Sequence, residues 1–122
     1  MKAQILCIDN DHIINFIHSK IIRKKYPNTP LLFFENGQRG LLHIKNNPNY
    51  DYLIFLDINM PEMNGWEFLT AITKQAPDVK LQVHILTSSV YPQDMMLSKK
   101  YNKVFSFLAK PLRVEVLEKI DF

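Results

Sequence analysis

Several features that mark particular classes of protein are scarce or missing in this chain of 122 residues. No apolar run approaches the roughly 20 residues that a membrane-spanning helix needs. The amino terminus lacks the three-part layout of a signal peptide. The single cysteine, Cys7, lies inside an apolar run, which favours a buried packing role over redox chemistry. We therefore expect a cytosolic protein that does not associate with a membrane.

The charge pattern argues against direct binding of nucleic acid. The net charge is +3 at pH 7, and the basic residues are scattered. Two short basic clusters, at 23–25 and 99–100, fall where helices are expected to end, and cations there complement the helix dipole. A basic stripe interleaved with aromatic residues is absent, so no nucleic-acid partner is expected. Nor do the histidines have the spacing of a metal site; they are His12, His18, His43 and His84.

What the chain does contain is a regular alternation of short apolar runs with longer segments of helical periodicity. Strands are expected at 4–8, 31–34, 52–56, 83–86 and 104–108, and helices at 12–26, 39–45, 66–75, 92–100 and 112–120. In the first helix the apolar positions are expected to form the buried face; they are Ile13, Ile14, Phe16, Ile17, Ile21 and Ile22. Strands joined by helix-length crossovers predict one α/β domain with a parallel sheet and helices on both faces.

One apolar run leads directly into an acidic residue. Residues 52–56 are apolar without alternation, which is typical of a strand buried on both faces, and Asp57 follows them. Pro61 and Gly65 then end the strand and favour a loop. Ligands of open α/β sheets bind at the carboxyl ends of the strands. Asp57 is therefore the centre of a candidate site.

Other predicted strands also end in polar residues. These are Asp9 and Asn10 after the first strand, Thr87 and Ser88 after the fourth, and Lys110 after the fifth. In a sheet of order 2-1-3-4-5 the first and third strands are neighbours, so Asp9, Asn10 and Asp57 can share one cation. Ligands that are all oxygen atoms favour Mg²⁺ over Zn²⁺. The predicted site thus combines two carboxylates, a hydroxyl, an ammonium group and a magnesium ion.

Four segments of the chain, taken together and in order, resemble the receiver domain of two-component response regulators. They are Ile5–Asp11 (ILCIDND), Leu56–Gly65 (LDINMPEMNG), Leu86–Ser89 (LTSS) and Ala109–Pro111 (AKP). The resemblance runs from Lys2 nearly to the end of the chain. It implies a flavodoxin-like (βα)5 fold with strand order 2-1-3-4-5, and a stand-alone receiver domain over residues 1–122.

The resemblance also implies a role for each residue at the strand ends. Asp57 would be the phosphoacceptor, which takes a phosphoryl group from a sensor histidine kinase or a phosphotransfer protein. The implied Mg²⁺ ligands are Asp9, Asn10, Asp57 and the backbone carbonyl of Asn59. The remaining roles are Thr87 as the switch hydroxyl, Lys110 as the cation that pairs with the phosphate, the Ser88 backbone amide as a further donor, and Phe107 as the rotating switch aromatic. The Lys110–Pro111 bond is expected to be cis.

Such a domain is a phosphoacceptor rather than an enzyme. It signals to a downstream protein target through the face formed by the fourth helix, fifth strand and fifth helix, and a homodimer is one form that this output could take. Two residues depart from the family pattern. Asn10 stands where the family usually has a second acid, and Phe107 stands where tyrosine is common. Asn10 leaves open a second reading, in which the chain is a pseudo-receiver that binds proteins without being phosphorylated.

Two other classes with related folds or chemistry fit less well. Phosphatases of the haloacid dehalogenase type also use an aspartyl nucleophile, but they need a second acid two residues later, where this chain has Asn59. A flavodoxin needs a phosphate-binding loop after its first strand, and the acids Asp9 and Asp11 would repel a phosphate there. The sequence also has no Walker A motif.

Overall fold

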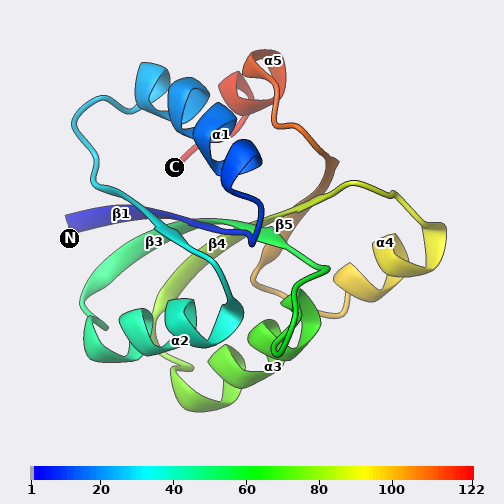
Figure 1. The fold of residues 1–122 in the computed structure, drawn as a ribbon. Helices are drawn as coiled ribbons and strands as arrows, with labels where there is room; N and C mark the ends of the chain where they lie inside the picture. Colours follow the sequence, from blue (N-terminus) through cyan, green and yellow to red (C-terminus); the bar gives the residue numbers. More distant parts are fainter. Residues whose placement is uncertain (1) are drawn as a thin grey trace.

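The computed structural model describes residues 2–122 and contains one five-stranded parallel sheet (Figure 1). The strands are β1 (Lys2–Ile8), β2 (Leu31–Phe34), β3 (Tyr50–Asp57), β4 (Lys80–Thr87) and β5 (Val104–Ala109). Their order is β2-β1-β3-β4-β5, which confirms the order predicted from the sequence. Each expected strand is present, and β3 and β4 begin a few residues earlier than expected.

The helices alternate with the strands and cover both faces of the sheet. They are α1 (His12–Lys25), α2 (Gly37–Asn46), α3 (Gly65–Gln75), α4 (Pro92–Ser98) and α5 (Val114–Glu118). In Figure 1, α1 and α5 lie on one face, α2 and α3 lie on the other, and α4 lies beside β5. Within residues 2–122 none of these helices has the length and apolar character that crossing a bilayer would require.

Helix α5 is shorter than the predicted segment 112–120. It begins late because the Leu112 amide donates to a side chain of α1 and Arg113 is extended, with φ −109° and ψ 152°. Ile120 lies beyond the end of the helix but is still buried, as expected for an inward-facing residue.

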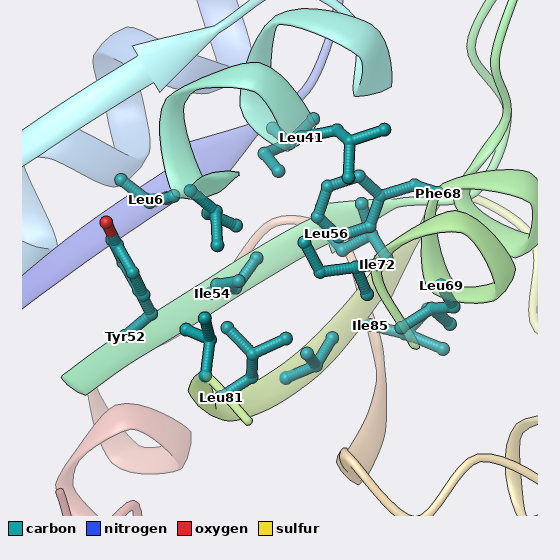
Figure 2. Close-up of a cluster of buried hydrophobic side chains, with 14 of the residues drawn as sticks. Leu6, Leu41, Tyr52, Ile54, Leu56, Phe68, Leu69, Ile72, Leu81 and Ile85 are labelled. Atoms are coloured by element: carbon teal, nitrogen blue, oxygen red, sulfur yellow. The ribbon is translucent and has the colours of Figure 1, made fainter. Parts of the chain in front are cut away.

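The strands divide their side chains between two apolar layers. On β1 and β3, Ile5 and Phe55 belong to the layer beneath α1 and α5, whereas Leu6 and Ile54 belong to the layer beneath α2 and α3. Figure 2 shows the second layer, in which the Tyr52 ring lies at one end of a row of aliphatic side chains. Burial on both faces explains why residues 52–56 are apolar without alternation.

Helix α1 contacts the sheet through a largely polar stripe, which corrects the expectation from its apolar periodicity. The buried residues of this helix are Asn15, His18, Ser19 and Ile22. Ile13 and Phe16, which were expected on the buried face, are 72% and 64% exposed. Of the six apolar positions in the predicted face, Ile22 is the one that is fully enclosed.

Two of the buried polar side chains of α1, Asn15 and His18, have backbone partners outside the helix. Asn15 Nδ2 donates to the carbonyl of Asp9 over 3.0 Å, and the Leu112 amide donates to His18 Nε2 over 3.0 Å. At the other end of the helix, Lys25 Nζ donates to a carbonyl of α5 over 2.8 Å. Buried polar groups are tolerated when they are hydrogen-bonded, and these contacts stabilise the inward-facing stripe, although Asn15 Oδ1 is buried without a partner among residues 2–122.

Candidate functional site

Three charged side chains from three different strands meet at the carboxyl edge of the sheet. Lys110 Nζ lies 2.6 Å from Asp9 Oδ2 and 3.2 Å from Asp57 Oδ1. Both acidic residues are only 4% exposed. The prediction that the ends of β1, β3 and β5 bring these groups together is confirmed by these distances.

Hydrogen bonds to the backbone orient both carboxylates. The Asp11 amide donates to Asp9 Oδ1 over 2.9 Å, and Asp11 itself caps helix α1. The Asn59 amide donates to Asp57 Oδ1 over 3.3 Å. One oxygen of Asp57 therefore receives both the Lys110 ammonium and the Asn59 amide, which leaves Oδ2 as the oxygen without a bonding partner among residues 2–122.

The loop after Asp57 returns close to the strand it leaves. The Gly65 amide donates to the carbonyl of Ile58 over 2.8 Å. A Cβ at position 65 would lie 2.7 Å from the Asp57 carbonyl oxygen and 2.9 Å from the Ile58 Cα, closer than side chains approach backbone. Glycine is therefore required here for the loop to close beside the candidate nucleophile.

Lys110 is positioned by a backbone hydrogen bond as well as by the ion pairs of its side chain. Its amide donates to the carbonyl of Thr87 over 2.8 Å, which joins the end of β5 to the end of β4. The Lys110–Pro111 peptide bond is cis, as the resemblance implied. The backbone thus delivers the ammonium group to the space between the two acids.

Burial and charge act in opposite directions on the groups of the site. Burial raises the pKa of Asp57, the charge of Asp9 raises it further, and Lys110 and the Asn59 amide oppose the change. Burial lowers the pKa of Lys110, but its hydrogen bonds and ion pairs with Asp9 and Asp57 outweigh burial and raise that pKa overall. One cation serves two acids, so the site has an excess of negative charge.

A surface cavity of about 400 Å³ opens over this group. It is lined by Asn10, Asp11, Ile14, Asp57, Asn59, Ser88, Lys110 and Pro111. The predicted residues Asn10, Asn59 and Ser88 therefore surround the same space as Asp57, and a small charged group can reach the Asp57 carboxylate through it. A larger hollow of about 480 Å³ lies among residues of the opposite, amino-terminal edge of the sheet, such as Ala3, Asp51 and Lys80, away from this chemistry.

The oxygen atoms of the four predicted ligands, of which Asn10, Asp57 and Asn59 line the cavity, fit a magnesium ion. They are the carboxylates of Asp9 and Asp57, the amide oxygen of Asn10 and the backbone carbonyl of Asn59. All are oxygen donors, and the negative charge that Lys110 leaves unbalanced favours a small divalent cation. Residues 2–122 hold no cluster of three or more histidine, cysteine or acidic side chains suited to a metal.

The two predicted switch residues lie next to the site. Thr87 is buried, and its hydroxyl donates to the carbonyl of Ser89 over 3.1 Å and accepts from the Ser89 amide over 3.3 Å. It is not among the residues that line the cavity. Phe107 is half-buried and borders two hollows, of about 540 and 250 Å³, beside α5 and α4. Both residues therefore lie on strands that end at the site, and Phe107 has free volume around it.

Sequence reasoning missed the support that α1 gives to the site. Asn15 holds the backbone of Asp9, and His18 holds the backbone that follows Pro111. Both residues share one helix face with Ile22, at spacings of three and four residues, and that second stripe could have identified them.

The pKa of Asp57 predicts how its substitution changes stability with pH. A carboxyl whose pKa is raised by folding stabilises the folded state below its unfolded pKa, near 3.8, and this contribution is lost as the pH rises through the folded value. We expect Asp57→Asn to increase the free energy of unfolding at pH 7 by about 1.4 kcal/mol for each unit of the pKa increase. Urea unfolding of both proteins at several pH values measures this, and the difference should shrink below pH 3.8. A variant less stable than the wild type at pH 7 would show that the Lys110 ion pair outweighs burial.

Comparison with known proteins places this site in a family. The family model described as the response regulator receiver domain matches residues 5–120. Among solved structures, a two-component response regulator from Cytophaga hutchinsonii has a TM-score of 0.84 and 27% identity, with 97% of this chain and 93% of that chain covered. A receiver protein from Dyadobacter fermentans shares the fold, with a TM-score of 0.84 and 21% identity over 96% of this chain and 93% of that one.

Curated relatives contain this domain within longer chains. Hybrid signal transduction histidine kinase H of Dictyostelium discoideum is 30% identical over 95 residues, which is 75% of this chain and 6% of that protein. The two-component response regulator ARR10 of Arabidopsis thaliana is 25% identical over 118 residues, which is 96% of this chain and 20% of that protein. The present chain spans at most a fifth of the length of these relatives. With its fold and the family match over residues 5–120, the chain belongs to the response regulator receiver domain family.

Proposed function

We propose that this receiver domain accepts a phosphoryl group on Asp57 from the phosphohistidine of a sensor kinase or a phosphotransfer protein, with Mg²⁺ as its cofactor. One observation carries the proposal. Asp57 Oδ2 has no bonding partner among residues 2–122, while Oδ1 of the same carboxylate is held by Lys110 in the wall of an open cavity. That arrangement suits an oriented nucleophile with a cation beside it.

The transfer needs charge stabilisation more than covalent assistance. Asp57 Oδ2 attacks phosphorus, the bond from phosphorus to the histidine nitrogen breaks, and its electron pair stays on the imidazole. The product is an acyl phosphate. Lys110 and the Ser88 amide bind the phosphoryl oxygens as negative charge moves onto them. Bound by Asp9, Asp57, Asn10 and the Asn59 carbonyl, Mg²⁺ would supply further positive charge.

The acyl phosphate then alters the output surface. Thr87 exchanges its bonds with Ser89 for a bond to a phosphoryl oxygen, which draws the loop after β4 toward the site. The hollows beside Phe107 give its ring room to change position as that loop moves. A charge at Asp57 thus biases two arrangements of the surface formed by α4, β5 and α5, where a downstream protein or a second copy of the chain binds.

Substitution of the acceptor tests the proposed reaction. With Mg²⁺ and acetyl phosphate, intact mass measurement should show one added phosphoryl group on the wild type and none on Asp57→Asn, because an amide oxygen is a poor nucleophile. The mark should be labile, as an acyl phosphate is, and should not form when Mg²⁺ is chelated before acetyl phosphate is added. Labelling of Asp57→Asn to the wild-type extent would mean that another residue is the acceptor.

The exposed apolar face of α1 supports a protein as the phosphodonor. Ile13 and Phe16 lie on the outer side of this helix, and Ile14 lines the cavity over Asp57. A partner that covers this face buries apolar side chains that folding leaves in water. The same partner brings its phosphohistidine to the mouth of the cavity.

Substitution of Phe16 distinguishes the docking of the phosphodonor protein from the chemical step at Asp57. We expect Phe16→Ser to slow transfer from a cognate phosphorylated kinase by about tenfold, since an anchoring aromatic contributes more than about 1 kcal/mol. Its reaction with acetyl phosphate should be unchanged, because Phe16 does not line the cavity. Leu42→Ser is the matched control, since Leu42 is 58% exposed on α2, which covers the other face of the sheet. Equal rates for both variants and the wild type would exclude α1 as the docking face.

Asn10 supports a second candidate function, a pseudo-receiver that binds proteins without phosphorylation. The amide supplies one negative charge fewer than the acid that the family usually has at this position. In this reading Mg²⁺ binding is too weak for transfer, and the chain acts through its surfaces alone.

Restoring the acid distinguishes the two functions. We expect Asn10→Asp to tighten Mg²⁺ binding by about tenfold, the equivalent of about 1.4 kcal/mol, because a carboxylate replaces an amide ligand. Calorimetry measures the affinity, and the acetyl phosphate reaction measures the consequence. Unchanged affinity would show that Asn10 is not a ligand. Phosphorylation of the variant alone, with none in the wild type, would favour the pseudo-receiver.

A further inference from the structure

We propose that His18 is a positioning residue for Lys110. By accepting the Leu112 amide, it holds the segment Lys110–Leu112 against α1, so that the ammonium group stays between Asp9 and Asp57. This inference deepens the proposed function and rests on it for its effect on phosphoryl transfer. Its structural part, the placement of Lys110, holds whether or not Asp57 is phosphorylated.

The contact itself assigns the protonation state of His18. The side chain is 1% exposed, and its Nε2 lies 3.0 Å from the Leu112 amide nitrogen. A backbone amide only donates, so Nε2 carries no proton and the neutral ring has its proton on Nδ1. Burial lowers the pKa of His18 and so favours this neutral form, although Asp9 opposes the change. The histidine therefore acts as a hydrogen-bond acceptor inside the protein.

The backbone around Pro111 depends on this acceptor. Proline has no amide hydrogen, so the donors of the segment Lys110–Leu112 are those of its first and last residues. The Lys110 amide donates to Thr87 on β4, and the Leu112 amide donates to His18 on α1. The segment is thus fixed on both sides of Pro111, to two elements that approach it from different directions.

This double attachment sets where the lysine side chain begins. Lysine has a long side chain with many rotamers, so the Nζ position depends on the orientation of its backbone as well as on its partners. Nζ reaches two carboxylates at once, at 2.6 and 3.2 Å, and a small rotation of the backbone would break one of these contacts. We infer that release of the Leu112 amide frees Lys110 to leave Asp57.

Two substitutions of His18 distinguish the effect of its hydrogen bond to the Leu112 amide from the effect of packing alone. His18→Leu fills the buried site with an apolar side chain but leaves the Leu112 amide without an acceptor. His18→Gln keeps an acceptor, because its Oε1 is the same number of bonds from Cβ as His18 Nε2. A role in packing alone predicts similar behaviour for both variants, whereas positioning predicts that glutamine rescues the function.

The first measurement is the rate at which acetic anhydride acylates Lys110. The full chain is treated without metal or phosphodonor, and mass spectrometry follows the reaction. Lys110 should react slowly in the wild type, severalfold faster in His18→Leu, and near the wild-type rate in His18→Gln. Exposed Lys24 is the reference. Lys103 is half-buried and donates to the Val79 carbonyl over 3.1 Å, so it reports any general loosening of the fold. Its rate should not change.

The second measurement is phosphorylation by acetyl phosphate at saturating Mg²⁺. The rate should fall by about tenfold to a hundredfold in His18→Leu, as misplacement of one charged group by about 1 Å would cause, and recover in His18→Gln. The inference is overturned if acylation of Lys110 is unchanged in His18→Leu, if Lys103 responds equally, or if glutamine does not rescue. Faster acylation with an unchanged phosphorylation rate would also overturn it. A wild type that accepts no phosphate refutes the proposed function, and acylation then decides the positioning role alone.

Discussion

The shared ion pair of Lys110 with Asp9 and Asp57 is the interaction on which the site depends. Two buried carboxylates repel each other, and a buried charge without a partner is strongly destabilising. Lys110 relieves this for both acids, and the three residues come from the ends of three strands. Lys110 offsets only part of the cost, because burial and Asp9 still raise the pKa of Asp57, and one negative charge is left unbalanced. In the proposed function, the remaining negative charge attracts a cation, and that cation in turn attracts a phosphoryl group.

Helix α1 connects this charge cluster to the surface of the protein. Its polar stripe faces inward, where Asn15 and His18 hold the backbone on both sides of the site. Its apolar stripe, with Ile13 and Phe16, is consequently left in water. One orientation of one helix therefore supports the backbone of the site and leaves apolar side chains exposed beside it, where we propose that the phosphodonor docks. A helix turned by about half a rotation would lose both properties, because each stripe would then lie on the wrong side.

Much of this architecture could be predicted from the sequence, because the topology of a parallel sheet determines where the residues at its strand ends lie. Residues that follow parallel strands must meet at one edge, so Asp9, Asp57 and Lys110 could be brought together before any distance was known. The orientation of α1 could not be predicted from apolar periodicity. The spacing of apolar residues indicates which side chains favour burial, but it does not indicate which polar side chains have hydrogen-bond partners elsewhere in the chain. His18 is buried through a hydrogen bond to a residue 94 positions away, and no local pattern contains that information. The late start of α5 at Val114 has the same cause.

The most direct test of the account is a crystal structure of the protein with Mg²⁺ and beryllofluoride, which mimics a phosphoryl group. We expect a metal bound by Asp9, Asn10, Asp57 and the Asn59 carbonyl, and a beryllofluoride group on Asp57 Oδ2. We also expect that Lys110 Nζ moves from Asp57 to a fluorine atom while keeping its contact with Asp9. A structure with neither ligand at Asp57, and with Lys110 still between both carboxylates under saturating conditions, would contradict the account.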